Sequence, residues 1–70
     1  MVFSKSKMIA RLENNGMGDA ITSGIIDIMN NLDGQAVSTA SWNRHVNGAP
    51  VFSCKGKDGK YYEVNEADCI

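Results

Sequence analysis

A β-hairpin is predicted by residues 50–64, Pro50-Val-Phe-Ser-Cys-Lys-Gly-Lys-Asp-Gly-Lys-Tyr-Tyr-Glu-Val64. Two runs rich in aromatic and β-branched residues flank a central Asp-Gly pair, which is a strong short-range hairpin signal. A three-residue loop over 57–59 pairs Cys54 with Tyr62 and Phe52 with Val64, so these four side chains share one face. A two-residue loop would shift the register and place Tyr62 and Val64 on the opposite face from Phe52 and Cys54. We favour the three-residue loop, because its last residue is then a glycine in the left-handed conformation.

A second hairpin is predicted upstream, where Asn47-Gly48 follows a β-compatible run over 35–42. A three-residue loop, Val46-Asn47-Gly48, would pair Trp42 with Phe52 and Ala40 with Cys54. Trp42 would then share the apolar face of the first hairpin. A longer loop, with 43–48 irregular, remains an alternative. Together the two hairpins predict a three-stranded antiparallel meander.

The first half of the chain predicts two helices. The first covers residues 4 to about 15, with Ser4 as its N-cap and Gly16 as its stop. The second begins at Thr22 or Asp19 and ends before Gly34. Each carries apolar residues at helical spacing, which indicates one buried face. These residues are Met8, Ile9 and Leu12 in the first helix, and Ile21, Ile25, Ile28, Met29 and Leu32 in the second.

These patterns predict an α+β fold in a single domain of 70 residues. A helical hairpin over 1–33 packs on a small curled antiparallel β-meander of three to four strands over 34–70. Such a sheet is compatible with an SH3-like barrel. A chain of this length buries only about 60% of its unfolded surface, so a disulfide, a metal or a partner subunit would help to stabilise it.

Composition favours some classes of protein over others. The net charge is −1, which disfavours a nucleic-acid-binding protein that relies on electrostatic attraction. No run is long and apolar enough for a membrane span, and the first residues lack the apolar core of a signal peptide. We therefore expect a cytoplasmic protein with no membrane association. In that compartment Cys54 and Cys69 are expected to be free thiols, although a bridge between them remains an alternative.

The sequence offers little for catalysis. The soft metal ligands are His45, Cys54 and Cys69, without the spacing of a metal site. No glycine-rich phosphate loop is present, and His45 faces away from Cys54 in the predicted register. We therefore expect no enzyme activity, no metal and no cofactor.

Two surfaces are candidates for binding. The reverse face of the hairpin carries Val51, Ser53, Lys55, Tyr61 and Glu63, and the second helix has apolar surface to spare at Ile26. We therefore predict a non-enzymatic accessory or adaptor protein that binds a protein partner or a second copy of itself as a homodimer. The alternative is a small nucleic-acid-binding module, in which cations among aromatic residues hold phosphates and stack bases. The candidate binding residues are Arg44, Val51, Ser53, Lys55, Lys57, Lys60 and Tyr61, with Trp42 added for nucleic acid.

Overall fold

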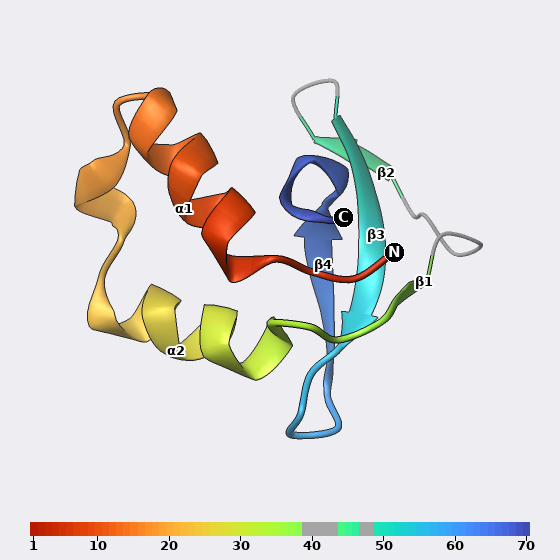
Figure 1. The fold of residues 1–70 in the computed structure, drawn as a ribbon. Helices are drawn as coiled ribbons and strands as arrows, with labels where there is room; N and C mark the ends of the chain where they lie inside the picture. Colours follow the sequence, from red (N-terminus) through yellow and green to blue (C-terminus); the bar gives the residue numbers. More distant parts are fainter. Residues whose placement is uncertain (39–43, 47–48) are drawn as a thin grey trace.

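The structure is a computed structural model that describes residues 1–38, 44–46 and 49–70. The described chain forms helices on one side of a small antiparallel sheet, so the predicted α+β fold is confirmed (Figure 1). The elements in chain order are α1 (Lys5–Asn14), η1 (Gly18–Ala20), α2 (Ser23–Leu32), β1 (Val37–Ser38), β2 (Arg44–Val46), β3 (Ala49–Lys55), β4 (Tyr61–Asn65) and η2 (Glu66–Asp68).

Both helices begin at the caps that the sequence offers. The Ser4 hydroxyl accepts a hydrogen bond from the Lys7 amide at 3.2 Å, and the Thr22 hydroxyl accepts one from the Ile25 amide at 3.4 Å. These bonds satisfy amides that have no partner within the helix. After α1 the chain turns at Gly16, whose φ of 70° lies in the left-handed region. The predicted start and stop of the first helix are therefore confirmed. Of the two candidate starts of the second helix, Thr22 is the cap, while Asp19 lies in η1, and the chain turns after α2 at Gly34 with a φ of 78°.

The hairpin of β3 and β4 has the predicted register. Cys54 pairs with Tyr62 and Phe52 with Val64. The Gly59 amide donates to the Gly56 carbonyl at 3.0 Å and closes the turn, and Gly59 itself has a φ of 83°. This is the expected three-residue loop with a left-handed glycine at its end.

The second hairpin differs from the prediction. Val46 pairs with Ala49 and His45 with Pro50, whereas the predicted register would pair His45 with Ala49. The predicted three-residue register of this hairpin was therefore wrong by one residue. The predicted partner of Ala40 was Cys54, which instead pairs with Val37 of β1. Trp42 and Ala40 themselves lie outside the described residues.

β3 is the central strand of the described sheet. β4 pairs along one of its edges, and β1 and β2 pair with it at different positions. Figure 1 shows β1 and β2 on the side of β3 away from β4. This described sheet is open, so the SH3-like barrel is not formed.

The first residues of the chain form backbone hydrogen bonds with the segment after α2 and with the end of the chain, which the sequence did not predict. The Phe3 amide donates to the Gln35 carbonyl at 3.0 Å. Val2 and Ile70 exchange two backbone hydrogen bonds, each of 2.8 Å. Residues 1–4 therefore lie between the segment that follows α2 and the end of the chain (Figure 1).

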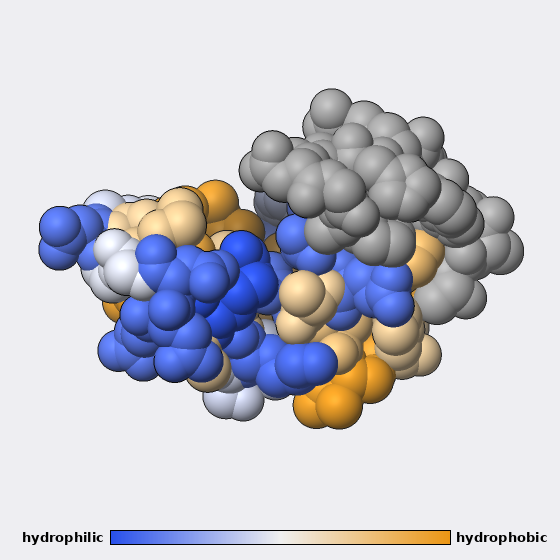
Figure 2. Space-filling view, turned by 90° about the horizontal axis from the view of Figure 1, so that it is seen from above, coloured by the Kyte–Doolittle hydropathy of each residue, from blue (hydrophilic) through white to orange (hydrophobic). Residues whose placement is uncertain are grey.

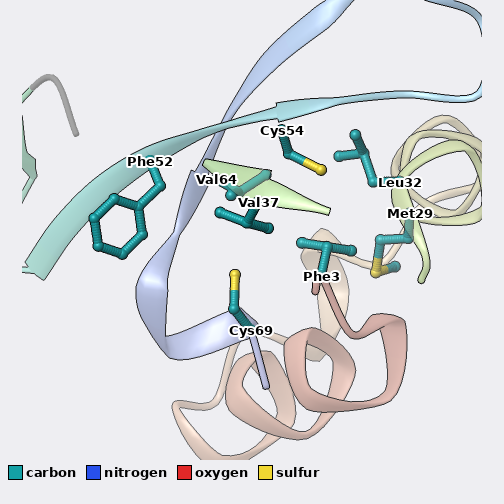
Figure 3. Close-up of a cluster of buried hydrophobic side chains, with 8 residues drawn as sticks. All are labelled: Phe3, Met29, Leu32, Val37, Phe52, Cys54, Val64 and Cys69. Atoms are coloured by element: carbon teal, nitrogen blue, oxygen red, sulfur yellow. The ribbon is translucent and has the colours of Figure 1, made fainter. Parts of the chain in front are cut away.

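The hydrophobic core lies where this N-terminal segment, α2 and the sheet meet. Side chains from these elements point toward one another in Figure 3. Phe3 and Met29 come from the helical side, and Cys54 and Val64 come from the sheet. The buried cluster is formed by Phe3, Met29, Leu32, Val37, Phe52, Cys54, Val64 and Cys69.

Both cysteines are buried as free thiols, as expected, and no disulfide joins them. Burial raises the pKa of the Cys54 thiol. Burial, with a smaller contribution from the nearby Asp68 carboxylate, raises the pKa of Cys69 to about 11. Both thiols therefore stay protonated at neutral pH and act as small apolar core groups.

Neither α1 nor α2 is long and apolar enough to cross a membrane, and this holds for every helix in the described part of the chain.

Candidate functional site

A groove lies between α1, α2 and β4. Its volume is about 250 Å³, and core side chains form its apolar floor. Phe3, Leu32 and Val64 are buried there, while Met8 is half-buried. We call this the apolar groove, and its lining consists of Phe3, Met8, Arg11, Ile28, Leu32, Glu63, Val64, Asn65 and Asp68.

Ile28 gives the apolar groove its exposed hydrophobic surface. The sequence places Ile28 on the same helical stripe as Met29 and Leu32, but only Met29 and Leu32 are buried. Ile28 remains 43% exposed at the edge of the stripe. Ile26, at the other edge, is half-buried. The surplus apolar surface of α2 therefore lies mainly at Ile28, rather than at the predicted Ile26.

An ion pair contributes to the wall of the groove. Arg11 binds Asp68 through two nitrogen–oxygen contacts of 2.6 and 3.0 Å, in the bidentate geometry that suits a carboxylate. Asp68 is 2% exposed, whereas the Arg11 side chain is 30% exposed. The hydrogen bond to Asp68 raises the pKa of Arg11. The two residues are 57 positions apart, so the sequence pattern gave no signal for this pair.

A second hollow lies on the other side of Arg11, over α1 and η2, with a volume of about 380 Å³. Lys7 reaches into the same region and donates to the Cys69 carbonyl at 3.0 Å. Viewed from above, the surface over α1 is mostly hydrophilic (Figure 2). We call this the basic groove, and its lining consists of Lys7, Ala10, Arg11, Asn14, Asn15 and Ala67.

The tip of the β3–β4 hairpin docks on the last turn of α2. The Asn31 side-chain carbonyl accepts a hydrogen bond from the Asp58 amide at 3.0 Å. Lys57 donates its backbone amide to the Asn31 carbonyl at 3.0 Å and its ammonium group to the Asn30 carbonyl at 2.9 Å. These bonds satisfy carbonyls that the end of a helix leaves unpaired. Lys57 therefore has a structural role in holding the hairpin.

A hydrogen bond within this tip makes stability depend on pH. The Tyr62 hydroxyl donates to the Asp58 carboxylate at 2.6 Å. This bond lowers the pKa of Asp58 and raises the pKa of Tyr62. The bond requires a charged Asp58 and a neutral Tyr62. Its contribution to the stability of the fold is therefore fully present between about pH 4 and about pH 10.

We expect Tyr62→Phe to lower the urea midpoint most between those limits. Below about pH 4 the contribution falls as Asp58 protonates, and above about pH 10 it falls as Tyr62 ionises, so the two proteins should converge at both ends. Urea unfolding of both proteins across the pH range measures the difference. A difference that stays constant from acid to alkali would contradict this assignment.

The candidate binding residues on the hairpin differ in how far their side chains are exposed. Val51 is 5% exposed, so the side chain of this candidate is buried rather than presented at the surface. Tyr61 is 72% exposed, and the Lys55 ammonium lies 5.9 Å from its ring centroid, close enough for a cation–π contact. Lys60 is exposed and Ser53 is half-buried. The Arg44 backbone belongs to β2, but its side chain lies outside the described part of the structure.

The described residues contain no group of three or more His, Cys, Asp or Glu side chains placed to hold a metal ion. Comparisons with protein-family models, with curated proteins and with solved structures find no match. The two grooves and the exposed surface of the hairpin are therefore the candidate sites in the described part of the chain.

Proposed function

We propose that this protein is a non-enzymatic binding protein whose apolar groove receives a hydrophobic side chain of a protein partner. The observation that carries the proposal is the 43% exposure of Ile28 beside a floor of buried apolar side chains. An isoleucine exposed on the surface alone is ordinary, but one that borders an apolar hollow can be covered by a partner.

The size of the groove supports a side chain as its occupant. Small-molecule and cofactor sites usually enclose about 300–1,000 Å³, and the apolar groove has about 250 Å³. Such a space suits one anchoring residue of a protein, the kind of contact that contributes much of the energy at protein interfaces.

The overall packing does not itself require a second subunit. The accessible surface is 4290 Å², close to the roughly 4,300 Å² expected for a compact monomer of 7.6 kDa. Self-association therefore remains one form of the proposal, with a second copy as the partner. In either form, the partner is the protein whose side chain occupies the apolar groove.

The state of the two thiols supports a non-catalytic function. Nucleophilic catalysis by cysteine requires a thiolate, usually one stabilised by a nearby cation or histidine. Burial raises the pKa of both Cys54 and Cys69 instead. Neither thiol is thus prepared for attack on a substrate.

Photo-crosslinking in cells of the native host tests the proposed function. A photoreactive benzophenone amino acid replaces Ile28 in one variant and Met17 in a control variant. Met17 is 48% exposed and is not among the residues that line the apolar groove, so it matches Ile28 in exposure but not in position. We expect a distinct protein adduct from position 28 that position 17 does not give. The same adducts from both positions would reject the proposal.

The alternative function, nucleic-acid binding, has one supporting observation, which is the exposed Tyr61 ring with Lys55 beside it. Such a pair can stack a base and contact a phosphate. Lys57 donates its ammonium group to the Asn30 carbonyl at the end of α2. Fewer cations of the hairpin are therefore available to contact phosphates than the sequence predicted. This alternative predicts that a photoreactive group at position 61, rather than at position 28, crosslinks to nucleic acid.

A further inference from the structure

The apolar groove and the basic groove share Arg11, so they form two adjoining parts of one surface. One part has an apolar floor, and the other is lined by two cations, two amides and two alanines. A partner segment that crosses Arg11 would contact both parts.

The charges of the basic groove favour an acidic partner. Lys7 and Arg11 lie four positions apart on α1, which brings their side chains to the same face of the helix. Among the described residues that line this groove, none is acidic. Asp68 neutralises part of the charge of Arg11, but Lys7 contacts a backbone carbonyl and keeps its full charge.

Both cations retain hydrogen-bond donors for a ligand. An ammonium group has three donors, and a single bond from Lys7 to a carbonyl oxygen is described. A guanidinium group has five, and Arg11 uses two nitrogens on Asp68 while its side chain stays 30% exposed. A carboxylate near the surface of α1 could therefore bind without displacing either contact.

We propose that the partner is an acidic amphipathic segment, with a large apolar side chain in the apolar groove and an Asp or Glu side chain against Lys7 and Arg11. This inference rests on the proposed function and adds the chemistry of the partner to it. Residues three or four apart on a helix lie about 5–6 Å from each other, so a helical segment would carry its acid about one turn from its apolar anchor.

Selection of random linear peptides displayed on phage against the full chain tests this chemistry. We expect enriched peptides to combine a large apolar residue with Asp or Glu within about four positions. A synthetic peptide from the enriched set should bind Ile28→Asp at least tenfold more weakly than the unmodified protein. Lys7→Glu should weaken the same peptide about tenfold, and added salt should weaken it further. Circular dichroism checks that each variant is folded.

Lys5→Glu is the matched control, because it makes the same charge change on α1 at a lysine that lines neither groove. We expect it to change the affinity less than twofold. Enriched peptides that need Ile28 but are neutral or basic would overturn the acidic partner and leave the proposed function standing. Enriched peptides that bind Lys7→Glu and Lys5→Glu equally well would have the same consequence. Failure to enrich any peptide that depends on Ile28 would count against both.

Discussion

Phe3→Ala is expected to remove most of the stability of this protein. Phe3 is 2% exposed and packs in the core cluster with side chains of α2 and the sheet. Truncation of a buried phenylalanine costs about 3–5 kcal/mol, through lost burial and the cavity left behind. A chain of 70 residues has a total stability of about 3.5–10 kcal/mol. The variant should therefore be largely unfolded or unfold at low urea concentration, as measured by circular dichroism.

Tyr61→Ala is the control for this prediction, because it truncates an aromatic side chain that is 72% exposed. Its urea midpoint should stay close to that of the unmodified protein, since exposed substitutions usually change stability by less than about 0.5 kcal/mol. A Phe3→Ala protein as stable as Tyr61→Ala would show that residues 1–4 do not complete the core.

Replacing Arg11 and replacing Asp68 should lower the free energy of unfolding by different amounts. Arg11→Met leaves a carboxylate that is 2% exposed without its counter-charge, which we expect to cost about 2–4 kcal/mol. Asp68→Asn leaves an arginine that water still reaches, and its amide oxygen can accept one bond, so we expect about 1–2 kcal/mol. Urea unfolding of the two variants and of the double variant measures each cost and their coupling.

The order of these two effects is the informative result. If Asp68→Asn costs more than Arg11→Met, the buried carboxylate is not the group that limits stability. Lys60→Met serves as the control for loss of a cation at an exposed site, and we expect a change of less than about 0.5 kcal/mol.

The elements that the sequence predicted well are those encoded by neighbouring residues. Ser4 and Thr22 cap helices through amides three positions away, and Gly59 ends a loop of three residues. In these cases the residue and the backbone group with which it forms a hydrogen bond lie within one turn. A local pattern is then sufficient to predict the structure.

Contacts between distant parts of the chain were not predictable in this way. Nothing in the periodicity of α1 indicates that Arg11 meets Asp68, or that Phe3 pairs with the segment after α2. Likewise, the alternation of side chains along β3 places Val51 on the face opposite to Phe52. It does not indicate whether other residues cover the face that carries Val51. The apolar groove depends on such contacts, so its lining residues were recognised as a site from the structure and not from the sequence.

The most direct test of the apolar groove compares the adducts formed by one photoreactive group at positions 28, 17 and 61 in the native host. We expect a protein adduct that is strong from position 28, absent from position 17 and absent from position 61. A nucleic-acid adduct from position 61, with none specific to position 28, would contradict it and favour the hairpin surface as the binding site.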